Sequence, residues 1–302
     1  MRIGTFLLAA VLTGGGLSIA HGATIVSDNF DGYANQAAFE AAWVPIGSTL
    51  DTTKKSAQLS TAQASSAPNS AFVPVSTTAT TTSTEFRNRR TFAETSTLAS
   101  AGNLGIGDTI TWSFDYYDST PAGAPQRNFA NLQDTTAPGS SNQLVSMGLN
   151  NNQTAANSGG QFYMARILGY TVPTTADPDG GATESVGGAG AYFKLNDFAA
   201  GARSLGWHNL KVVISTDDGV ATDYAFYVDS VLAERVDNIG GAGTIRSYDN
   251  IAIGSGLTNG GVSAYFDNMS LAVTPVVVPE PATMALVGLT CVSLLAARKR
   301  RV

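Results

Sequence analysis

The sequence contains almost no cysteine or histidine, which excludes disulfides and several kinds of metal and catalytic site. Its 302 residues include one cysteine, Cys291, and two histidines, His21 and His208. No disulfide can form within the chain, and because His21 and Cys291 lie in the two terminal segments, His208 alone in the body cannot make a zinc site of three or four Cys and His ligands. Because Cys291 lies in an apolar run near the C-terminus, the rest of the chain also lacks a thiolate nucleophile.

Basic residues are scarce as well. The chain has 17 Lys and Arg against 23 Asp and Glu, and five of the basic residues lie at its two ends, at Arg2 and at 298–301. With Glu280 also set aside, the body of the chain keeps 12 basic and 22 acidic residues, a formal charge of −10. Such a surface repels phosphate backbones and anionic lipids, so binding of nucleic acid, or of membrane through a basic patch, is disfavoured. It suits a secreted domain that meets neutral glycans or cations.

The N-terminus has the layout of a secretory signal peptide. Arg2 stands in a short n-region, residues 6–12 are apolar, and small residues follow at 20, 22 and 23. We therefore predict a signal peptide over residues 1–23 and a mature chain that begins near Ala23 or Thr24. A buried N-terminal helix is the alternative, but the glycines at 14–16 would break it just after its apolar run.

The C-terminus carries a second targeting pattern. Residues 282–297 contain no charge, and apolar neighbours lengthen this run toward the about 17 to 25 residues that usually span a membrane. A basic cluster follows, which should stay on the cytoplasmic side; it consists of Arg298, Lys299, Arg300 and Arg301. We predict a transmembrane helix at this position. An amphipathic surface helix or a buried core helix is the alternative, and neither needs a terminal basic cluster.

The order of these features resembles a known sorting signal. A short motif, made of Val278, Pro279, Glu280 and Pro281, precedes the apolar run, and the basic cluster follows it. Residues 276–302 are thus similar to the PEP-CTERM sorting domain of Gram-negative bacteria that secrete polysaccharide. The resemblance implies export across the inner membrane, transient anchoring there by the C-terminal helix, and cutting near the motif by an exosortase, a membrane peptidase. The expected destination is the cell surface or the extracellular space.

The body, residues 24–275, is a series of short strand-like runs. Residues 109–117 alternate, and their expected core side holds Ile110, Trp112, Phe114 and Tyr116. Further runs, separated by Gly, Asn and Asp turns, occur at 161–168, 191–195, 210–215, 224–232, 250–254 and 263–273. Helical periodicity is confined to residues 36–43. Because helices do not alternate with the strands, we predict one all-β domain, an antiparallel β-sandwich of the jelly-roll type.

Four short motifs add a second resemblance. They are D-N-F-D-G-Y at 28–33, followed by a short helix that ends at Trp43, then W-H-N-L-K-V at 207–212, F-Y-V-D-S at 226–230 and Y-F-D-N-M-S-L at 265–271. In this order they are similar to the concanavalin A-like, laminin-G-like jelly rolls of secreted bacterial proteins. The resemblance implies that the first and last strands pair. Ser230 stands where glycine is usual, so the turn there is expected to be longer or differently shaped.

Catalytic signatures are missing from the body. Jelly-roll glucanases place two carboxylates in step on one strand, whereas Asp115 and Asp118 are three residues apart and Asp177 and Asp179 have no glutamate in step. No G-x-S-x-G elbow accompanies His208, which we interpret as a structural residue. We therefore predict a non-catalytic protein that binds an extracellular polysaccharide or builds the matrix. The alternative is a carbohydrate-active enzyme, a glycoside hydrolase or polysaccharide lyase, on the same scaffold.

Two acidic groups are candidates for Ca²⁺, the one cofactor that the sequence suggests. Pairing of the terminal strands would bring Asp28, Asp31 and Asp267 together, although capping of backbone amides is the preferred role for them. The loop at 177–184 also offers oxygen ligands. It lacks the length and the third acid of an EF-hand loop, so a solvated turn is the preferred interpretation.

Aromatic and basic residues complete the set of candidates. A flat ring can present an apolar face to a sugar, but Trp43, Trp112 and Trp207 lie in contexts typical of a core. Four tyrosines are less committed to the core, namely Tyr116, Tyr117, Tyr163 and Tyr170. Residues 85–90 contain the only cluster of basic residues in the sequence of the body. We expect this cluster to be a solvated strand face whose charges pair with carboxylates.

The tail gives the first testable prediction. Replacing residues 298–301 by Ser should let the chain slip through the membrane and escape uncut, since four adjacent charges oppose translocation by on the order of 10 kcal/mol. Replacing residues 279–281 by Ala should instead leave an intact protein in the inner membrane. Mass measurement of the C-terminus in cell fractions, in hosts with and without the exosortase, distinguishes the two. An exported wild-type protein that still ends at Val302 would contradict cutting.

Overall fold

The computed structural model describes most of the body of the chain. The described residues are 22–46, 55–75, 86–93, 106–120, 126–134, 143–150, 160–168, 185–187, 190–216, 222–237, 248–254 and 261–275, all within the compact unit Gly22–Pro275. The predicted signal peptide, apart from Gly22 and Ala23, and the predicted tail at 276–302 lie outside them. In the described ranges, no helix has the length and apolar character needed to cross a membrane.

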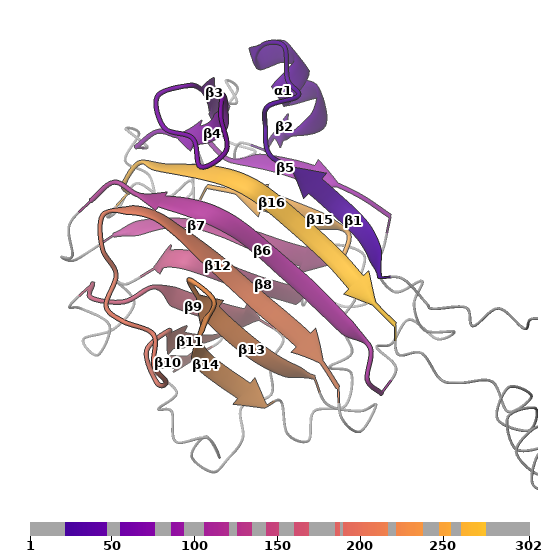
Figure 1. The fold of residues 1–302 in the computed structure, drawn as a ribbon, viewed down its shortest axis with the longest axis vertical. Helices are drawn as coiled ribbons and strands as arrows, with labels where there is room; N and C mark the ends of the chain where they lie inside the picture. The colour runs from indigo at the N-terminus through magenta and orange to yellow at the C-terminus, as the bar shows by residue number, and fades with distance from the viewer. Residues whose placement is uncertain are drawn as a thin grey trace, which may run out of the picture. The chain divides into compact units, whose positions relative to one another are not determined.

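Two antiparallel sheets of eight strands make up this unit (Figure 1). Sheet A has the order β14-β13-β12-β6-β16-β4-β3, with β1 also paired to β16, and sheet B has the order β10-β11-β9-β8-β7-β15-β5-β2. In chain order the elements are β1 (Ala23–Asp28), α1 (Gln36–Ala42), β2 (Val44–Pro45), β3 (Gln58–Ser60), β4 (Ser70–Val73), β5 (Asn88–Thr91), β6 (Thr109–Asp118), β7 (Arg127–Asp134), β8 (Gln143–Asn150), β9 (Met164–Leu168), β10 (Ser185–Gly187), β11 (Gly190–Lys194), β12 (Gly206–Ser215), β13 (Asp223–Val228), β14 (Val231–Asp237), β15 (Asn250–Ile253) and β16 (Ala264–Thr274). The predicted all-β antiparallel architecture is confirmed.

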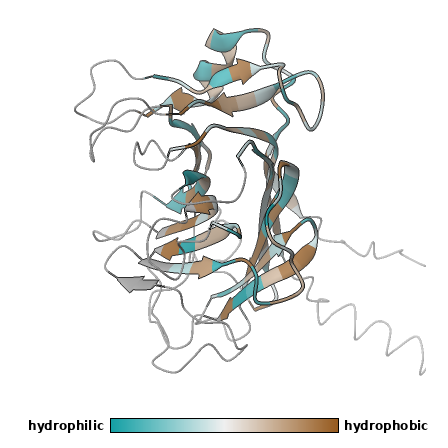
Figure 2. Ribbon diagram, turned by 90° about the vertical axis from the view of Figure 1, so that its left-hand side faces the viewer, coloured by the Kyte–Doolittle hydropathy of each residue, from teal (hydrophilic) through white to brown (hydrophobic). Residues whose placement is uncertain are grey.

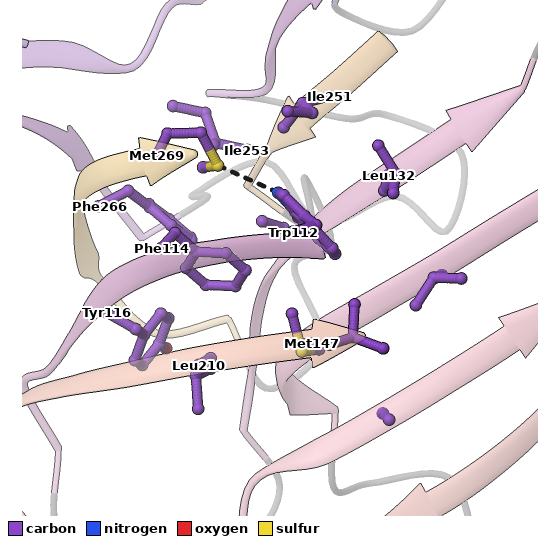
Figure 3. Packing of buried hydrophobic residues seen from close by; sticks show 14 of the residues in the cluster. Trp112, Phe114, Tyr116, Leu132, Met147, Leu210, Ile251, Ile253, Phe266 and Met269 are labelled. Carbon is purple, nitrogen blue, oxygen red and sulfur yellow. Dashed lines mark hydrogen bonds between the residues drawn. The ribbon is translucent and has the colours of Figure 1, made fainter. Parts of the chain in front are cut away.

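The two sheets pack face to face (Figure 2). A cluster of buried apolar side chains forms the core. On β6 the predicted core side is buried, with Ile110, Trp112, Phe114 and Tyr116 at most 1% exposed. Trp112 and Phe114 contact each other at a ring distance of 5.1 Å, and Trp112 Nε1 lies 3.2 Å from Met269 Sδ (Figure 3). The alternation read from the sequence thus decides which face of each strand enters the core.

The first and last strands pair, as the second resemblance implies. β6 pairs with one edge of β16, and the other edge of β16 is shared by two strands. Residues 264–266 pair with β4, and residues 269–273 pair with β1, where Ser27 lies opposite Ser270. The N-terminal and C-terminal strands of the body are therefore held in the same sheet by backbone hydrogen bonds.

The predicted helix at residues 36–43 is confirmed as α1. Asn35 is its N-cap, because the Asn35 side chain accepts a hydrogen bond from the backbone amide of Ala38 at 3.0 Å. Phe39 is the buried residue of this helix, and its ring contacts that of Phe30 at 6.1 Å. The helix thereby packs onto the core through one apolar side chain.

Two features differ from the sequence-based expectations. The run at 224–232 is a hairpin of β13 and β14, whose turn is tight: Val228 pairs with Val231, and Asp229 and Ser230 adopt φ angles of 50° and 68°. A tight turn of this type needs positive φ at both central residues, which Asp and Ser can supply without glycine. β7 and β8 were not predicted, because residues 128–132 and 144–149 are buried on both faces and therefore do not alternate.

Candidate functional site

Four aromatic side chains form a continuous row on the outer face of sheet A. Tyr265 of β16 is the register partner of Phe72 on β4 and of Tyr117 on β6, and Tyr117 is the partner of Trp207 on β12. The ring centroids lie 4.6 Å apart for Phe72 and Tyr265, 5.7 Å for Tyr265 and Tyr117, and 5.3 Å for Tyr117 and Trp207. All four side chains are half-buried. We call this set the aromatic row.

The core fixes the position of the aromatic row. Each member directly follows or precedes a residue that points into the core, such as Tyr116 before Tyr117 and Phe266 after Tyr265. Since side chains alternate along a strand, the members point outward, and antiparallel pairing aligns them across four strands. With neighbouring strands about 4.8 Å apart, the row crosses roughly 15 Å of the sheet.

A row of polar side chains lies two residues away from the aromatic row along the same strands. Asp115 of β6 is at its centre, where Asp115 Oδ1 accepts from Asn209 Nδ2 at 2.8 Å. Asp115 Oδ2 accepts from Ser65 Oγ at 2.6 Å and from Asn268 Nδ2 at 2.8 Å. Amide and hydroxyl groups thus border the aromatic rings on one side.

Asp267 brings a second carboxylate to this polar row, as the register partner of Asp115. Asp267 Oδ2 accepts from the backbone amides of Ser65 and Ser66, both at 2.8 Å, and the carboxylate is fully buried. Burial raises the pKa of Asp267 above its ordinary value, and the backbone hydrogen bond from Ser66 is the largest of the contacts that limit this rise. Both carboxylates therefore hold the chain around Ser65 against sheet A.

Asp28 and Asp31, the other two candidate calcium ligands, each have their own partners. Asp28 accepts from the Phe30 amide at 2.9 Å and from Trp43 Nε1 at 2.9 Å, and it also bonds the Tyr33 hydroxyl and forms an ion pair with Arg90. Among the residues that the structure describes, no group of three or more His, Cys, Asp or Glu side chains is arranged to hold a metal ion. The contacts of Asp28 are those of a structural anchor for β1, α1 and β5.

Asp31 has a similar structural role. Its Oδ1 accepts from the backbone amide of Asn69 at 2.8 Å, and its Oδ2 accepts from Asn29 Nδ2 at 2.8 Å. Capping of backbone amides, the role that the sequence favoured over metal binding, describes both Asp31 and Asp267. The acidic loop at 177–184 lies outside the described residues.

His208 lies between Ser204 and Asp229 at distances that resemble those of a catalytic triad. Its Nδ1 is 2.7 Å from Asp229 Oδ2, and its Nε2 is 3.1 Å from Ser204 Oγ. However, Nε2 also lies 2.9 Å from the Ser204 carbonyl oxygen, which can only accept a hydrogen bond. When Nε2 carries the proton that this bond requires, it has no lone pair to take the proton of Ser204. The geometry supports the interpretation of His208 as structural.

Asp115 and Asp118, which are near each other in sequence, face opposite sides of sheet A. Asp118 is buried and forms a two-point ion pair with Arg203, at 2.7 Å to Nε and 3.0 Å to Nη2. The Tyr163 hydroxyl donates to the same carboxylate at 3.3 Å, and burial raises the pKa of Tyr163 above its ordinary value. Asp118 is therefore committed to an internal ion pair and does not join Asp115 in a shared site.

The burial of the aromatic residues considered for sugar binding differs in part from the sequence-based expectation. Trp43, Trp112, Tyr116 and Tyr163 are all buried. Burial of Tyr116 agrees with its predicted place on the core side of β6, whereas Tyr163 is more buried than expected and Trp207, expected in the core, is only half-buried. Trp207 and Tyr117 lie in the aromatic row, and Tyr170 lies outside the described residues. Phe72 and Tyr265 were missed. Their alternation with core residues is visible in the sequence, but only the strand register places them beside Tyr117.

Comparison with known proteins separates the tail from the body. Residues 277–301 match the PEP-CTERM protein-sorting motif, so the resemblance of the tail is confirmed. The motif implies export, transient membrane anchoring and recognition by an exosortase. No curated protein matches the sequence.

Among solved structures, the body is similar to carbohydrate-active enzymes. An endo-1,3-β-glucanase from Streptomyces sioyaensis gives a TM-score of 0.50 at 13% identity, over 84% of this chain and 97% of that chain. The alginate lyase Aly36B gives 0.47 at 9% identity, over 82% and 95%, and an endo-β-1,4-glucuronan lyase from the fungus Trichoderma reesei gives 0.45 at 13% identity, over 84% and 96%. At this identity the likeness to the glucanase concerns the fold alone, which is that of a jelly roll.

The contacts of Asp28 yield a prediction about stability. Asp28→Ala should lower the free energy of unfolding by about 3 kcal/mol, because it leaves Arg90 and Trp43 Nε1 without their acceptor. Asp31→Ala, which removes two hydrogen bonds and no ion pair, serves as the control and should cost about 1 kcal/mol. Urea unfolding measures both. Stabilisation of the wild type by Ca²⁺ that disappears in Asp28→Ala would instead identify Asp28 as a metal ligand.

Proposed function

We propose that this protein is exported, sorted by an exosortase, and binds a neutral polysaccharide at the cell surface or in the extracellular matrix, without catalysis. The observation that carries the proposal is the aromatic row of Phe72, Tyr265, Tyr117 and Trp207, in which each ring contacts the next across four strands. A row of half-buried rings on a sheet face offers apolar surface to the C–H face of sugars. Its linear form suits an extended polymer better than a single sugar.

The polar row beside the rings supports the same ligand class. Sugar hydroxyls need hydrogen-bonding partners when a binding surface removes them from water. Asn209, Asn268 and Ser65 place amide and hydroxyl groups near the aromatic row, and their hydrogen bonds to Asp115 hold them there. Combined apolar faces and neutral polar groups are the usual composition of small-molecule and glycan sites.

The two ends of the chain suggest how the protein reaches the cell surface. In this proposal residues 1–23 direct export and are removed, and residues 24–275 fold outside the inner membrane. Residues 276–302 then hold the protein by a helix at 282–297 and its basic end until the exosortase cuts near residues 278–281. The sorting tail is supported by its match to the PEP-CTERM motif.

A second candidate function is hydrolysis of the bound polysaccharide. The observation that favours it is the pairing of Asp115 and Asp267 on adjacent strands, since retaining glycosidases need two carboxylates about 5 Å apart. Against it, Asp267 is fully buried, and the oxygens of both carboxylates accept bonds from the chain around Ser65. We therefore prefer binding without catalysis.

Hydrolysis and binding are distinguished by activity assays. We expect residues 24–275 to release no reducing sugar from β-1,3-glucan, β-1,4-glucan or mixed-linkage glucan. Release that is abolished by Asp115→Asn, with the variant still folded by circular dichroism, would establish the enzyme and overturn the preferred function. Asp31→Asn is the matched control, because it changes a carboxylate that lies outside the polar row.

Alanine substitutions in the aromatic row test the binding function. Trp207→Ala and Tyr117→Ala should each weaken binding of the polysaccharide that a glycan array identifies by about tenfold, since each loses about 1 to 2 kcal/mol of apolar contact. Tyr227→Ala is the control, because Tyr227 is a half-buried aromatic residue outside the row, beneath the ammonium group of Lys211 at 4.2 Å. Equal losses for Tyr227→Ala and the row variants in a polysaccharide pull-down would contradict the proposed site.

A further inference from the structure

Ring orientation changes along the aromatic row. The plane of the Tyr117 ring makes an angle of 89° with the Tyr265 ring and of 67° with the Trp207 ring, whereas the planes of Tyr265 and Phe72 differ by 32°. A flat ligand lies nearly parallel to an aromatic ring on which it stacks. It therefore cannot stack on Tyr117 and on a neighbour of Tyr117 at the same time.

The crossed ring of Tyr117 divides the row into two platforms. Trp207 forms one platform, and Tyr265 together with Phe72 forms the other. A ligand that uses the whole row stacks on both platforms and meets Tyr117 edge-on between them. The strands that carry Trp207 and Tyr265, β12 and β16, are separated by β6 alone, so the platforms are about 10 Å apart, or two strand spacings.

The residues that border the row are open to solvent on two sides and at one end. Leu205, two residues before Trp207, is 61% exposed. Ser65, which bonds the carboxylates of the polar row, is exposed, and so is Gln58, the register partner of Phe72 on β3. A long polymer that lies on the rings can therefore continue past Phe72 at the edge of sheet A.

Hydrogen-bonding groups lie on both sides of the rings. The polar row borders one side. On the other side, two residues beyond the rings of β6 and β16, Ser119 Oγ donates to the Ser263 carbonyl oxygen at 2.6 Å and lies 3.2 Å from Ser263 Oγ. Sugars with equatorial hydroxyls have apolar C–H groups on the faces of the ring and hydroxyls around its edge. Such a sugar, stacked on a platform, has polar partners for both edges.

We propose that the ligand of the aromatic row is an extended β-1,4-linked polymer of sugars with equatorial hydroxyls, of which cellulose is the simplest. This assignment rests on the proposed function of the row. In such a polymer each sugar is turned over relative to the one before it, so the chain is a straight ribbon. The same face recurs at every second sugar, a distance close to two strand spacings.

The ribbon fits the two platforms sugar by sugar. One sugar stacks on Trp207, the next passes over the edge of Tyr117, and the third stacks on Tyr265 and Phe72. Single chains of β-1,3-linked and α-1,4-linked glucose coil instead of extending. A coiled chain that lies flat on one platform turns away from the other, so the spacing of the platforms selects the linkage.

The experiment measures binding to the full-length chain in a detergent that contains no sugar. The probes are cellohexaose, laminarihexaose and maltohexaose, which are β-1,4-linked, β-1,3-linked and α-1,4-linked, and the method is isothermal titration calorimetry. We expect cellohexaose to bind about tenfold more tightly than the other two, because it alone gains the contact with a second platform. Cellotriose is the shortest chain that reaches both platforms, so affinity should also rise about tenfold from cellobiose to cellotriose.

Two variants test the platforms one at a time. Trp207→Ala and Tyr265→Ala should each weaken cellohexaose binding about tenfold, yet weaken cellobiose binding by no more than about threefold, because a disaccharide still has the other platform. Tyr227→Ala, the control outside the row, should change neither. Circular dichroism checks that each variant is folded.

The outcomes separate the linkage from the function. Laminarihexaose or maltohexaose binding as tightly as cellohexaose, and lost in Trp207→Ala, would overturn the linkage and leave glycan binding by the row intact. Equal affinity for cellobiose and cellotriose in the wild type would overturn the two platforms, whether or not a variant folds. If none of the three hexasaccharides binds, the linkage is wrong. The proposed function fails with it only if a glycan array also finds no neutral polymer that needs Trp207.

Discussion

The pairing of β6 with β16 is the constraint on which the rest of the structure depends. This ladder joins a strand from the middle of the body to its last strand, and it leaves the other edge of β16 for β4 and β1. It is set by core packing, because Trp112, Phe114 and Phe266 must all point inward. A register shift of one residue would turn the core-facing side chains of the shifted strand toward solvent. The packing that fixes the register therefore also fixes which side chains sheet A presents to solvent.

Side chains that the core does not use are thereby aligned on the outside. The aromatic row requires Tyr265 opposite both Phe72 and Tyr117, and the ladder that buries Phe266 and Tyr116 produces this arrangement. Asp115 and Asp267 are brought opposite each other by the same register, and they hold the chain around Ser65 next to the rings. The proposed polysaccharide site is thus a consequence of how the core is packed.

The outward positions of the two sheets carry different kinds of side chain. Sheet A carries neutral rings and amides, whereas sheet B carries arginines among short polar residues. Net charge, which averages over the whole body, hides this difference, and a formal charge of −10 is compatible with several arginines on one sheet. The proposed sorting to the cell surface would place the aromatic row of sheet A among secreted polymers.

The sequence by itself determined the sorting tail, the all-β class, the helix at residues 36–43 and the core side of β6, because these depend on local order or on alternation within one segment. Strands buried on both faces, such as β7, gave no alternation to detect. Only the tertiary structure decided that Phe72, Tyr265, Tyr117 and Trp207 form one row. It also decided that Arg87 and Arg89 face away from Arg90 and toward Arg166. Both outcomes depend on the register between strands far apart in the chain, which long-range packing sets and local pattern does not encode.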